Sequence, residues 1–436
     1  FAWDFFGTGK TVLRAMGGIY HSPRAGGGTT GGNLVSNPPF QRTFTVNNGN
    51  IDSLVTLVPK ALVTPSTING VQVQSATPTI YNFSLGVQHE LGFKTVLEMT
   101  YVGSLARHLG VKYNLNSVPD GAKFVDLHPE NRDPFTTNSA KNDNFLRPYQ
   151  GFGSINITNY NASSNYNGLQ VQVNRRYAST LQYGIAYTYS KTLDYGKDDD
   201  SSDVSYPRPY KKFNYGPANF DETHIFTANY IWELPKNGGI LNNHVVKAML
   251  GGWEASGLTS LVSGKPVSAG TVTYNSGTTT PVGGVCPSGS TLTSATVCTA
   301  ITDFTGGTVN ALPNMICNPN QGASGVSSTG IPIVINTSCF TKPLARGDIG
   351  NAGRNNIRLP GLITTDLAVM KNIPTTEKTS LQFRWEVYNL FNHTNFSAID
   401  TNLTFNASGA QTNSKFGVPT SARPPRIMQA SLRFSF

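Results

Sequence analysis

The chain has 436 residues, of which only 13% are charged, and it is rich in Gly (44), Phe (23) and Tyr (18). No run of about 18 apolar residues occurs, which excludes a protein with helical membrane spans. The net charge of +9 comes from scattered Lys and Arg residues without a basic helix or dense patch, so no nucleic-acid partner is expected. Abundant Gly, Asn and Pro disfavour helices, whereas aromatic and β-branched residues favour strands, and an all-β protein is predicted.

The first part of the chain predicts a turn, a strand and a long loop. FAWD at residues 1–4 is typical of the end of a strand that begins upstream, so we expect the chain to be the C-terminal portion of a longer protein. FFGTGK at residues 5–10 predicts a tight turn, since a phosphate-binding loop would need Gly in place of Asp4 and a helix afterwards. Residues 11–20 predict a strand, and residues 21–76 a Gly-rich loop with a short strand near Phe44.

Two hairpins with alternating apolar and polar residues follow. The first consists of residues 81–91 and 97–101, joined by a turn at residues 92–94, and the second of residues 169–176 and 181–190, joined near Ala178. Successive side chains of a strand point to opposite faces, so each of these strands has one apolar and one polar face. Long polar loops are predicted at residues 105–164 and 191–222.

Two more hairpins and a final strand complete the chain. The third hairpin pairs residues 226–234 with residues 252–262 across a turn at 235–251, and the fourth runs from Leu362 through a turn at 374–378 into TSLQFRWEVYNLFNHTNF. The longest loop, residues 266–360, separates these two hairpins. The last strand is RIMQASLRFSF, which ends at Phe436.

The connections therefore alternate between short and long, which is the strongest indication of architecture. Outer-membrane barrels have short periplasmic turns and long extracellular loops, and strands of about ten residues. A soluble sandwich would explain the alternation of side chains but not strands of this length. We predict an antiparallel transmembrane β-barrel, of which residues 1–436 are the C-terminal half with about 10–11 strands. Because an open sheet edge cannot face lipid, the fragment must close on itself, pair with the missing half, or remain unstable alone in a membrane.

Polar residues on the strands are candidates for the barrel lumen. They alternate with apolar residues and would line a hydrated channel or contact a plug; the alternative is that they only solvate the wall or pair with one another. The lumen-facing candidates are Glu90, Glu98, Gln172, Arg176, Arg384 and Glu386.

The four cysteines all lie in the predicted loop 266–360. An even number of Cys in one loop, without a CxxC spacing for metal, suggests two disulfides in an oxidising compartment. Four Cys permit three pairings, and we expect nearest neighbours because short closures form most easily. The disulfide candidates are thus Cys286 with Cys298 and Cys317 with Cys339.

No catalytic, cofactor or metal site is predicted. The His residues are dispersed and form no recognisable ligand spacing. The acidic residues Asp198, Asp199, Asp200 and Asp203 lack the Gly and terminal Glu of a calcium loop, which favours a solvated loop. The chain is therefore not expected to be an enzyme.

Several segments carry a family resemblance. GDIGNAGRNNIRLPGLITTDLAVMKNI (347–373), LQFRWEVYNLFNHTNF (381–396) and the terminal strand resemble the C-terminal barrel of TonB-dependent outer-membrane transporters of the Oar-like type, and TIYNFSLGVQHEL, DETHIFTANYIWELP and GGWEASGLTSLVSGKP are similar to its preceding hairpins. The family implies a signal peptide, a plug domain and a TonB contact segment, none of which lies in these residues. Phe434 and Phe436 resemble the signal that barrel-assembly machinery recognises; alternatively, Phe436 is only the last lipid-facing residue.

The resemblance implies a receptor of the Gram-negative outer membrane that takes up a ligand into the periplasm. Its partners would be outer-membrane lipid, the missing N-terminal barrel half and plug, the TonB complex and the barrel-assembly machinery. A passive porin-like channel, or a structural or adhesive surface protein, is the alternative. Siderophore, cobalamin, glycan and peptide ligands all use such barrels, so the substrate stays open.

Overall fold

A computed structural model describes most of the chain. The described residues are 1–22, 37–38, 65–74, 76–125, 127–135, 140–178, 180–195, 211–234, 251–274, 283–285, 299–301, 305–345, 347–375, 379–405 and 409–436. Phe44, Cys286, Cys298 and the acidic residues 198–200 and 203 lie outside them, so the expectations for these residues stay predictions.

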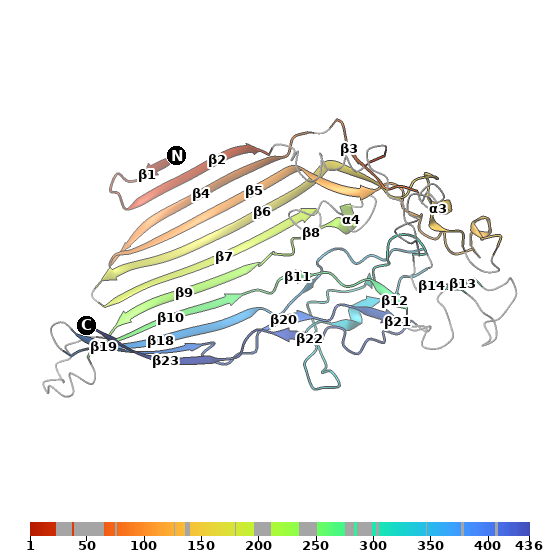
Figure 1. Cartoon of the computed structure of the whole chain (residues 1–436). Coiled ribbons are helices and arrows are strands. Elements are labelled where there is room, and N and C mark those ends of the chain that lie inside the picture. The colour runs from red at the N-terminus through yellow and green to blue at the C-terminus, as the bar shows by residue number, and fades with distance from the viewer. Residues whose placement is uncertain are drawn as a thin grey trace, which may run out of the picture.

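Long antiparallel strands make one curved sheet (Figure 1). Neighbouring strands follow the order β1-β2-β4-β5-β6-β7-β9-β10-β18-β19-β23, while β3 pairs with β6 and β8 with β7. The strands of this path are β1 (Ala2–Asp4), β2 (Thr11–His21), β4 (Thr79–Gly92), β5 (Thr95–Asn114), β6 (Ile155–Ala178), β7 (Leu181–Tyr195), β9 (His224–Glu233), β10 (Trp253–Val262), β18 (Leu362–Pro374), β19 (Ser380–Tyr388) and β23 (Ile427–Ser435), and the two side strands are β3 (Ile68–Val71) and β8 (Tyr215–Pro217).

The alternation of short and long connections is confirmed. At one end of the sheet, β4 ends at Gly92 and β5 starts at Thr95, and β18 and β19 are joined within residues 375–379. At the other end β5 and β6 are joined across residues 115–154, and β10 and β18 across residues 263–361. Figure 1 shows the short connections on the left and the long ones on the right. The short turn of the first hairpin uses left-handed backbone at Phe93 and Lys94, with φ of 48° and 58°.

Two strands extend well beyond the predicted ends. The prediction that residues 105–164 are a loop is wrong at both ends, because β5 continues to Asn114 and β6 already begins at Ile155. Their extensions pair with each other, as in Tyr113 opposite Ile157. The sequence INITNYNASSNYNG carries polar residues on both faces, so it lacks the periodic apolar face by which strands are recognised in a sequence.

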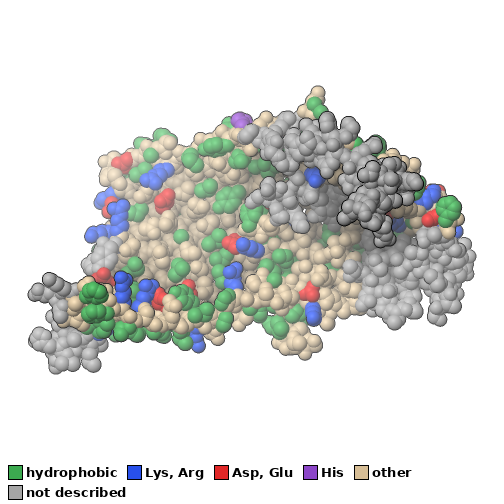
Figure 2. Space-filling view, in the orientation of Figure 1, with side chains coloured by type: hydrophobic (Ala, Val, Ile, Leu, Met, Phe, Trp, Pro, Cys, Tyr) green, Lys and Arg blue, Asp and Glu red, His purple; other side chains and the backbone are tan. Residues whose placement is uncertain are grey.

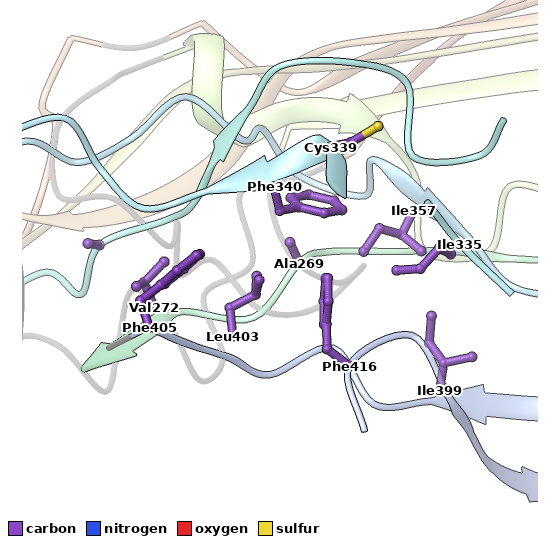
Figure 3. Packing of buried hydrophobic residues seen from close by; sticks show 11 residues of the cluster. Ala269, Val272, Ile335, Cys339, Phe340, Ile357, Ile399, Leu403, Phe405 and Phe416 are labelled. Carbon is purple, nitrogen blue, oxygen red and sulfur yellow. The ribbon is translucent and has the colours of Figure 1, made fainter. Parts of the chain in front are cut away.

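The predicted loop 266–360 is a folded body rather than a simple loop. Residues 263–361 and 389–426, here called the cap, share a core that includes Phe405 and Phe416 at 1% and 2% exposure. Figure 3 shows these side chains converging from segments far apart in sequence. The short strands of the cap are β11 (Pro266–Val267), β12 (Val272–Tyr274), β13 (Gly283–Val285), β14 (Thr299–Ile301), β15 (Asn314–Met315), β16 (Phe340–Thr341), β17 (Ile357–Arg358), β20 (Phe396–Ile399), β21 (Leu403–Phe405) and β22 (Pro419–Ala422).

The parallel pairing of β12 with β21 joins the two segments of the cap, because Val272 lies opposite Leu403. A disulfide between Cys317 and Cys339 adds a covalent link within the first segment, with the nearest-neighbour pairing expected for these two residues. The buried Cys339 packs in the same core as Phe340. The long connection between β10 and β18 is thus fixed in place by the connection between β19 and β23.

Helix is nearly absent from the described residues. α3 (Asp143–Leu146) and α4 (Lys211–Asn214) each span four residues, and two 3-10 turns lie at Pro129–Asn131 and Thr337–Cys339. None of the described helices is long and apolar enough to cross a membrane.

Candidate functional site on the polar face of the sheet

The register of the sheet sorts its side chains onto two faces. Residues paired directly across antiparallel strands lie on the same face, and alternate residues lie on opposite faces. One continuous row of partners runs across the sheet and is apolar throughout: Leu13, Val87, Met99, Val171, Tyr187, Phe226, Leu261 and Ile363. This side is called the apolar face, and the opposite side the polar face.

All four tryptophans of the chain lie on the apolar face. Trp3 is paired with Leu13 of the apolar row. Trp232 and Trp385 belong to a second row, in which Trp232 is paired with Ala255 and Trp385 with Val369. Trp253, at the start of β10, faces Lys371. Aromatic residues on the lipid-facing side of the strands are typical of transmembrane barrels.

The polar face carries the charged and amide side chains of the strands. Gln88 is paired with Glu98, and Glu98 with Gln172, so three strands contribute to one polar row. Charged groups are scattered over the sheet face turned to the viewer in Figure 2. The pairing of β5 with β6 places the predicted residues Glu98 and Gln172 directly side by side.

A first hollow of the polar face lies near the short connections at the β1–β5 side. Its volume is about 540 Å³, and it brings together the predicted residues Glu90 and Arg176 with three further polar groups, Lys10, Gln88 and Lys94. Lys10 and Lys94 come from the two turns at this end, and the backbone N–H of Glu90 donates to the carbonyl of Lys10 at 2.9 Å. The sequence singled out Glu90 and Arg176 by alternation, whereas the turn lysines lie outside that pattern.

A second hollow, of about 390 Å³, lies between β7 and β19. It is lined by the predicted residues Arg384 and Glu386 together with Asp366, Asn229 and Tyr388. The two hollows belong to different strands, so the six predicted residues form separate groups and not one site. The sequence did not single out Asp366 and Asn229 as lumen-facing candidates. Only the strand register places them beside Arg384 and Glu386.

Glu386 is the most enclosed charged group of the second hollow. Its side chain is 11% exposed, and its carboxylate accepts hydrogen bonds from Gln429 of the neighbouring strand β23 and, at 3.3 Å, from the hydroxyl of Tyr388. Arg384, two residues earlier on the same face, forms an ion pair with it. The carboxylate is therefore fixed in place, because three donors from two strands surround it.

Two arginines of the AGRNNIRLPG segment attach the cap to the strands. Arg354 forms an ion pair with Asp194 of β7 at 2.6 Å, and Arg358 forms one with Asp221, which also accepts from Lys191 at 3.1 Å. Asp221 is 1% exposed. Burial alone would raise the pKa of the Asp221 carboxyl, but hydrogen bonds from the Thr192 N–H, Arg358 and Lys191 outweigh it and lower the pKa below its usual value.

The segment NLFNHTNF forms a polar turn at the end of β19. Asn389 and Asn392 adopt left-handed backbone, each with φ of 52°. The Asn389 side chain donates to the carbonyl of His393 and accepts from its N–H, which closes the turn. Asn395 then pairs with Ile363 of β18 as a backbone would, accepting from its N–H at 2.8 Å and donating to its carbonyl at 2.9 Å. These bonds give a physical reason for the Asn residues of this segment.

The family model of the outer membrane beta barrel domain matches residues 1–429. The chain belongs to the outer membrane β-barrel family. Its antiparallel strands therefore cross the outer membrane, as the alternation predicted, and the apolar face meets hydrocarbon. In such barrels the short connections are typically periplasmic and the long ones extracellular, so the extracellular position of loop 266–360 stays a prediction.

Three of the solved structures that this chain is similar to are a transporter and two receptors. The outer membrane transporter YddB from Escherichia coli is 10% identical with a TM-score of 0.44, and the match covers 100% of this chain and 39% of that one. The ferric-catecholate import receptor Fiu from E. coli is 9% identical with a TM-score of 0.39, and the match covers 100% of this chain and 34% of Fiu. BauA, the ferric preacinetobactin receptor from Acinetobacter baumannii, is 10% identical with a TM-score of 0.38, and the match covers 99% of this chain and 35% of BauA.

The chain thus spans at most 39% of the length of these three proteins. A comparison with curated proteins gave no match.

Proposed function

We propose that this barrel chain is the C-terminal part of an outer-membrane receptor that takes up a ligand into the periplasm with energy from the TonB complex. The resemblance of GDIGNAGRNNIRLPGLITTDLAVMKNI and LQFRWEVYNLFNHTNF to Oar-like transporters supports the energy source. Membership in the outer membrane β-barrel family supports the location.

The observation that carries the proposal is the chemistry of the polar face. In a closed barrel the face opposite the lipid lines the lumen. Here that face holds fixed charged groups, such as Glu386 between Arg384 and Gln429, and hollows of about 540 and 390 Å³. Pockets of this size with a few convergent polar groups are suited to binding a ligand or the polar surface of another domain.

The cap supports a receptor function for the extracellular end. A ligand-binding surface needs a fixed shape, and the cap obtains one from its buried core, the Cys317–Cys339 disulfide and the ion pairs of Arg354 and Arg358. Long connections held in this way can present a constant surface to a solute at the mouth of the barrel.

The barrel itself needs strands beyond those described. β1 and β23 stand at the two ends of the strand path within the described residues. Unpaired backbone groups in lipid cost several kcal/mol each. We therefore propose that further strands join β1 to β23 in the full-length protein. The resemblance to Oar-like transporters supports a plug within the barrel.

The assembly machinery is the proposed partner of the last strand. Phe434 lies on the apolar face opposite Leu381, and its ring stacks near that of Phe436 at 6.2 Å between centroids. If these rings are the assembly signal, Phe436→Ala lowers the amount of folded protein in the outer membrane several-fold without changing the stability of the purified protein. An unchanged membrane level would contradict the signal.

Transport is tested with the full-length protein in cells and in planar bilayers. An energised receptor with a plug shows almost no channel current, cross-links to the periplasmic domain of TonB, and depletes a medium component only when the membrane is energised. The set of depleted components is found by comparing the medium of wild-type and deletion strains, with a protonophore as the matched control. A steady open-channel current without a TonB cross-link would instead identify a porin-like channel.

A further inference from the structure

A single cationic side chain interrupts the apolar face of β18. Ile363, Thr365, Leu367, Val369 and Ile373 share this face, and Lys371 stands among them. Lys371 is near the periplasmic end of the strand, because β18 ends at Pro374 and the short connection to β19 follows. A Lys on the lipid-facing side is costly at the middle of a bilayer, but the cost largely disappears near an interface. Its position is therefore that of a group at the level of lipid headgroups.

Aromatic residues are the partners of Lys371 on both neighbouring strands. On β10 its direct partner is Trp253, whose ring centre lies 4.9 Å from the Lys371 ammonium, and on β19 its direct partner is Phe383. Trp385 lies one step further along β19 on the same face. Lys371 as a residue is only 9% exposed, so its side chain lies against the wall beside the Trp253 ring and does not extend freely.

We propose that Lys371, Trp253 and Phe383 form a binding site for the phosphate of an anionic glycerophospholipid in the periplasmic leaflet. The ammonium supplies the charge that a phosphate requires, and the ring of Trp253 limits where the ammonium lies. The aromatic side chains contact the glycerol and upper acyl chain, which keeps the headgroup at the level of the girdle. Since all three residues lie on the outward face, the site is independent of what the barrel transports.

The lipid is favoured over a free anion by the surroundings of the ammonium. Ile373 and Leu432, which lie beside Lys371 and Phe383 on the apolar face, are 37% and 67% exposed and meet hydrocarbon in the membrane. A dissolved anion would gain the charge contact alone, whereas a lipid also covers these apolar side chains. The site thus anchors the barrel at one depth, through one lipid contact near the periplasmic turns.

The test uses full-length protein in detergent with added lipid, and counts bound lipids by native mass spectrometry. Wild-type protein is expected to bind phosphatidylglycerol more tightly than phosphatidylcholine, and Lys371→Gln is expected to lose about fivefold in affinity for phosphatidylglycerol, since one basic residue near the surface contributes about 1 kcal/mol. Lys371→Arg keeps the binding. Arg433→Gln is the matched control, because Arg433 lies near the same end of the sheet but on the polar face opposite Gln382.

Three results would overturn the site. The first is equal phosphatidylglycerol binding by the wild type and Lys371→Gln. The second is an equal loss of phosphatidylglycerol affinity in Lys371→Gln and Arg433→Gln. The third is release of the lipid by excess inorganic phosphate, which would assign the ammonium to a small anion. Folding of each variant is checked by its heat-modifiable migration on a gel. If Lys371→Gln does not fold, Trp253→Leu is used instead, because this variant keeps the charge of Lys371. It is expected to weaken phosphatidylglycerol binding about twofold to fivefold through the lost ring contact. Unchanged binding would contradict the proposal.

Discussion

Arg358 and Asp221 are 137 residues apart in sequence and form an ion pair between two long connections of the sheet. The Asp221 side chain is completely buried, and its carboxylate also receives the backbone N–H of Thr192 at 2.6 Å and the ammonium of Lys191. A second nitrogen of Arg358 donates to the Asp221 carbonyl at 2.7 Å and to the carbonyl of Gly264 at 3.2 Å. The pair therefore joins the end of β7, the start of β9 and the cap.

Replacing Arg358 should destabilise the cap more than any exposed charge change. Removal of one partner from a buried ion pair leaves an uncompensated charge and costs about 3–5 kcal/mol. Arg358→Met is thus expected to increase hydrogen exchange in residues 263–274 and 347–361, with the strands unchanged. Arg423→Met, which alters an exposed Arg of the same cap, is the control. Equal exchange in both variants would show that the pair contributes little.

Acid should release the same contact. The pKa of Asp221 is lowered in the folded protein despite its burial, because the Thr192 N–H, Arg358 and Lys191 stabilise the carboxylate. A group with a lowered pKa contributes stability that is fully present above its unfolded value, about 3.9 for Asp, and that is lost as the pH falls through the folded value. Proteolysis of the cap is expected to be constant at neutral pH and to increase below about pH 4. In Asp221→Asn the increase should shift or vanish; an identical pH profile would assign the acid response to another group.

The disulfide should matter for the cap and not for the barrel. Cys317 and Cys339 enclose a segment with a sequence separation of 22, and a loop of this size is stabilised by about 3 kcal/mol on closure. Cys317→Ser with Cys339→Ser is expected to make the cap sensitive to protease while heat-modifiable migration of the barrel persists. Reduction of the wild-type protein provides the independent comparison, and loss of the folded barrel band in either case would contradict this division.

Asn395 should contribute to the stability of the sheet although it lies outside the strands. Its amide replaces a backbone partner for Ile363 by bonding to both the N–H and the carbonyl of that residue. Asn395→Ala leaves two backbone groups unpaired at the start of β18 and is expected to cost about 1–3 kcal/mol in unfolding free energy. Asn395→Asp keeps the acceptor but turns a buried carboxylate oxygen toward the Ile363 carbonyl, so its loss should be the larger one. Chemical unfolding of the three proteins measures the order, and a larger loss for Ala than for Asp would be inconsistent with it.

Gly103 should not tolerate a side chain. It lies opposite Phe83 on the apolar face, and a Cβ at Gly103 would come within 2.2 Å of the Phe83 ring. Gly103→Val forces that ring to move and is expected to cost about 1–3 kcal/mol. Phe83→Leu combined with Gly103→Val should recover part of the loss, because the smaller side chain leaves room. Thermal unfolding that shows no difference between the single and double variants would rule out the contact as the cause.

The sequence alone was sufficient for the regular parts of the long strands, because alternation is a local property. Residues 81–91 show their two faces without reference to any other segment, and the turn at 92–94 fixes which strand is paired next. The same argument selected Arg384 and Glu386, two residues apart on one strand, as neighbours on the polar face. The prediction failed for the extensions of β5 and β6, where both faces are polar and no alternation exists to be recognised.

Only the tertiary structure decided how the long connections fold. Nothing near Asp221 in the sequence indicates Arg358 as its partner, and nothing near Glu386 indicates Gln429, because each pair depends on register and chain closure over many residues. The core of the cap likewise collects Val272, Phe340 and Phe416 from segments that show no period of their own. Local periodicity specifies which face a side chain takes, whereas long-range packing and ion pairs exist only once the whole sheet has brought its connections together.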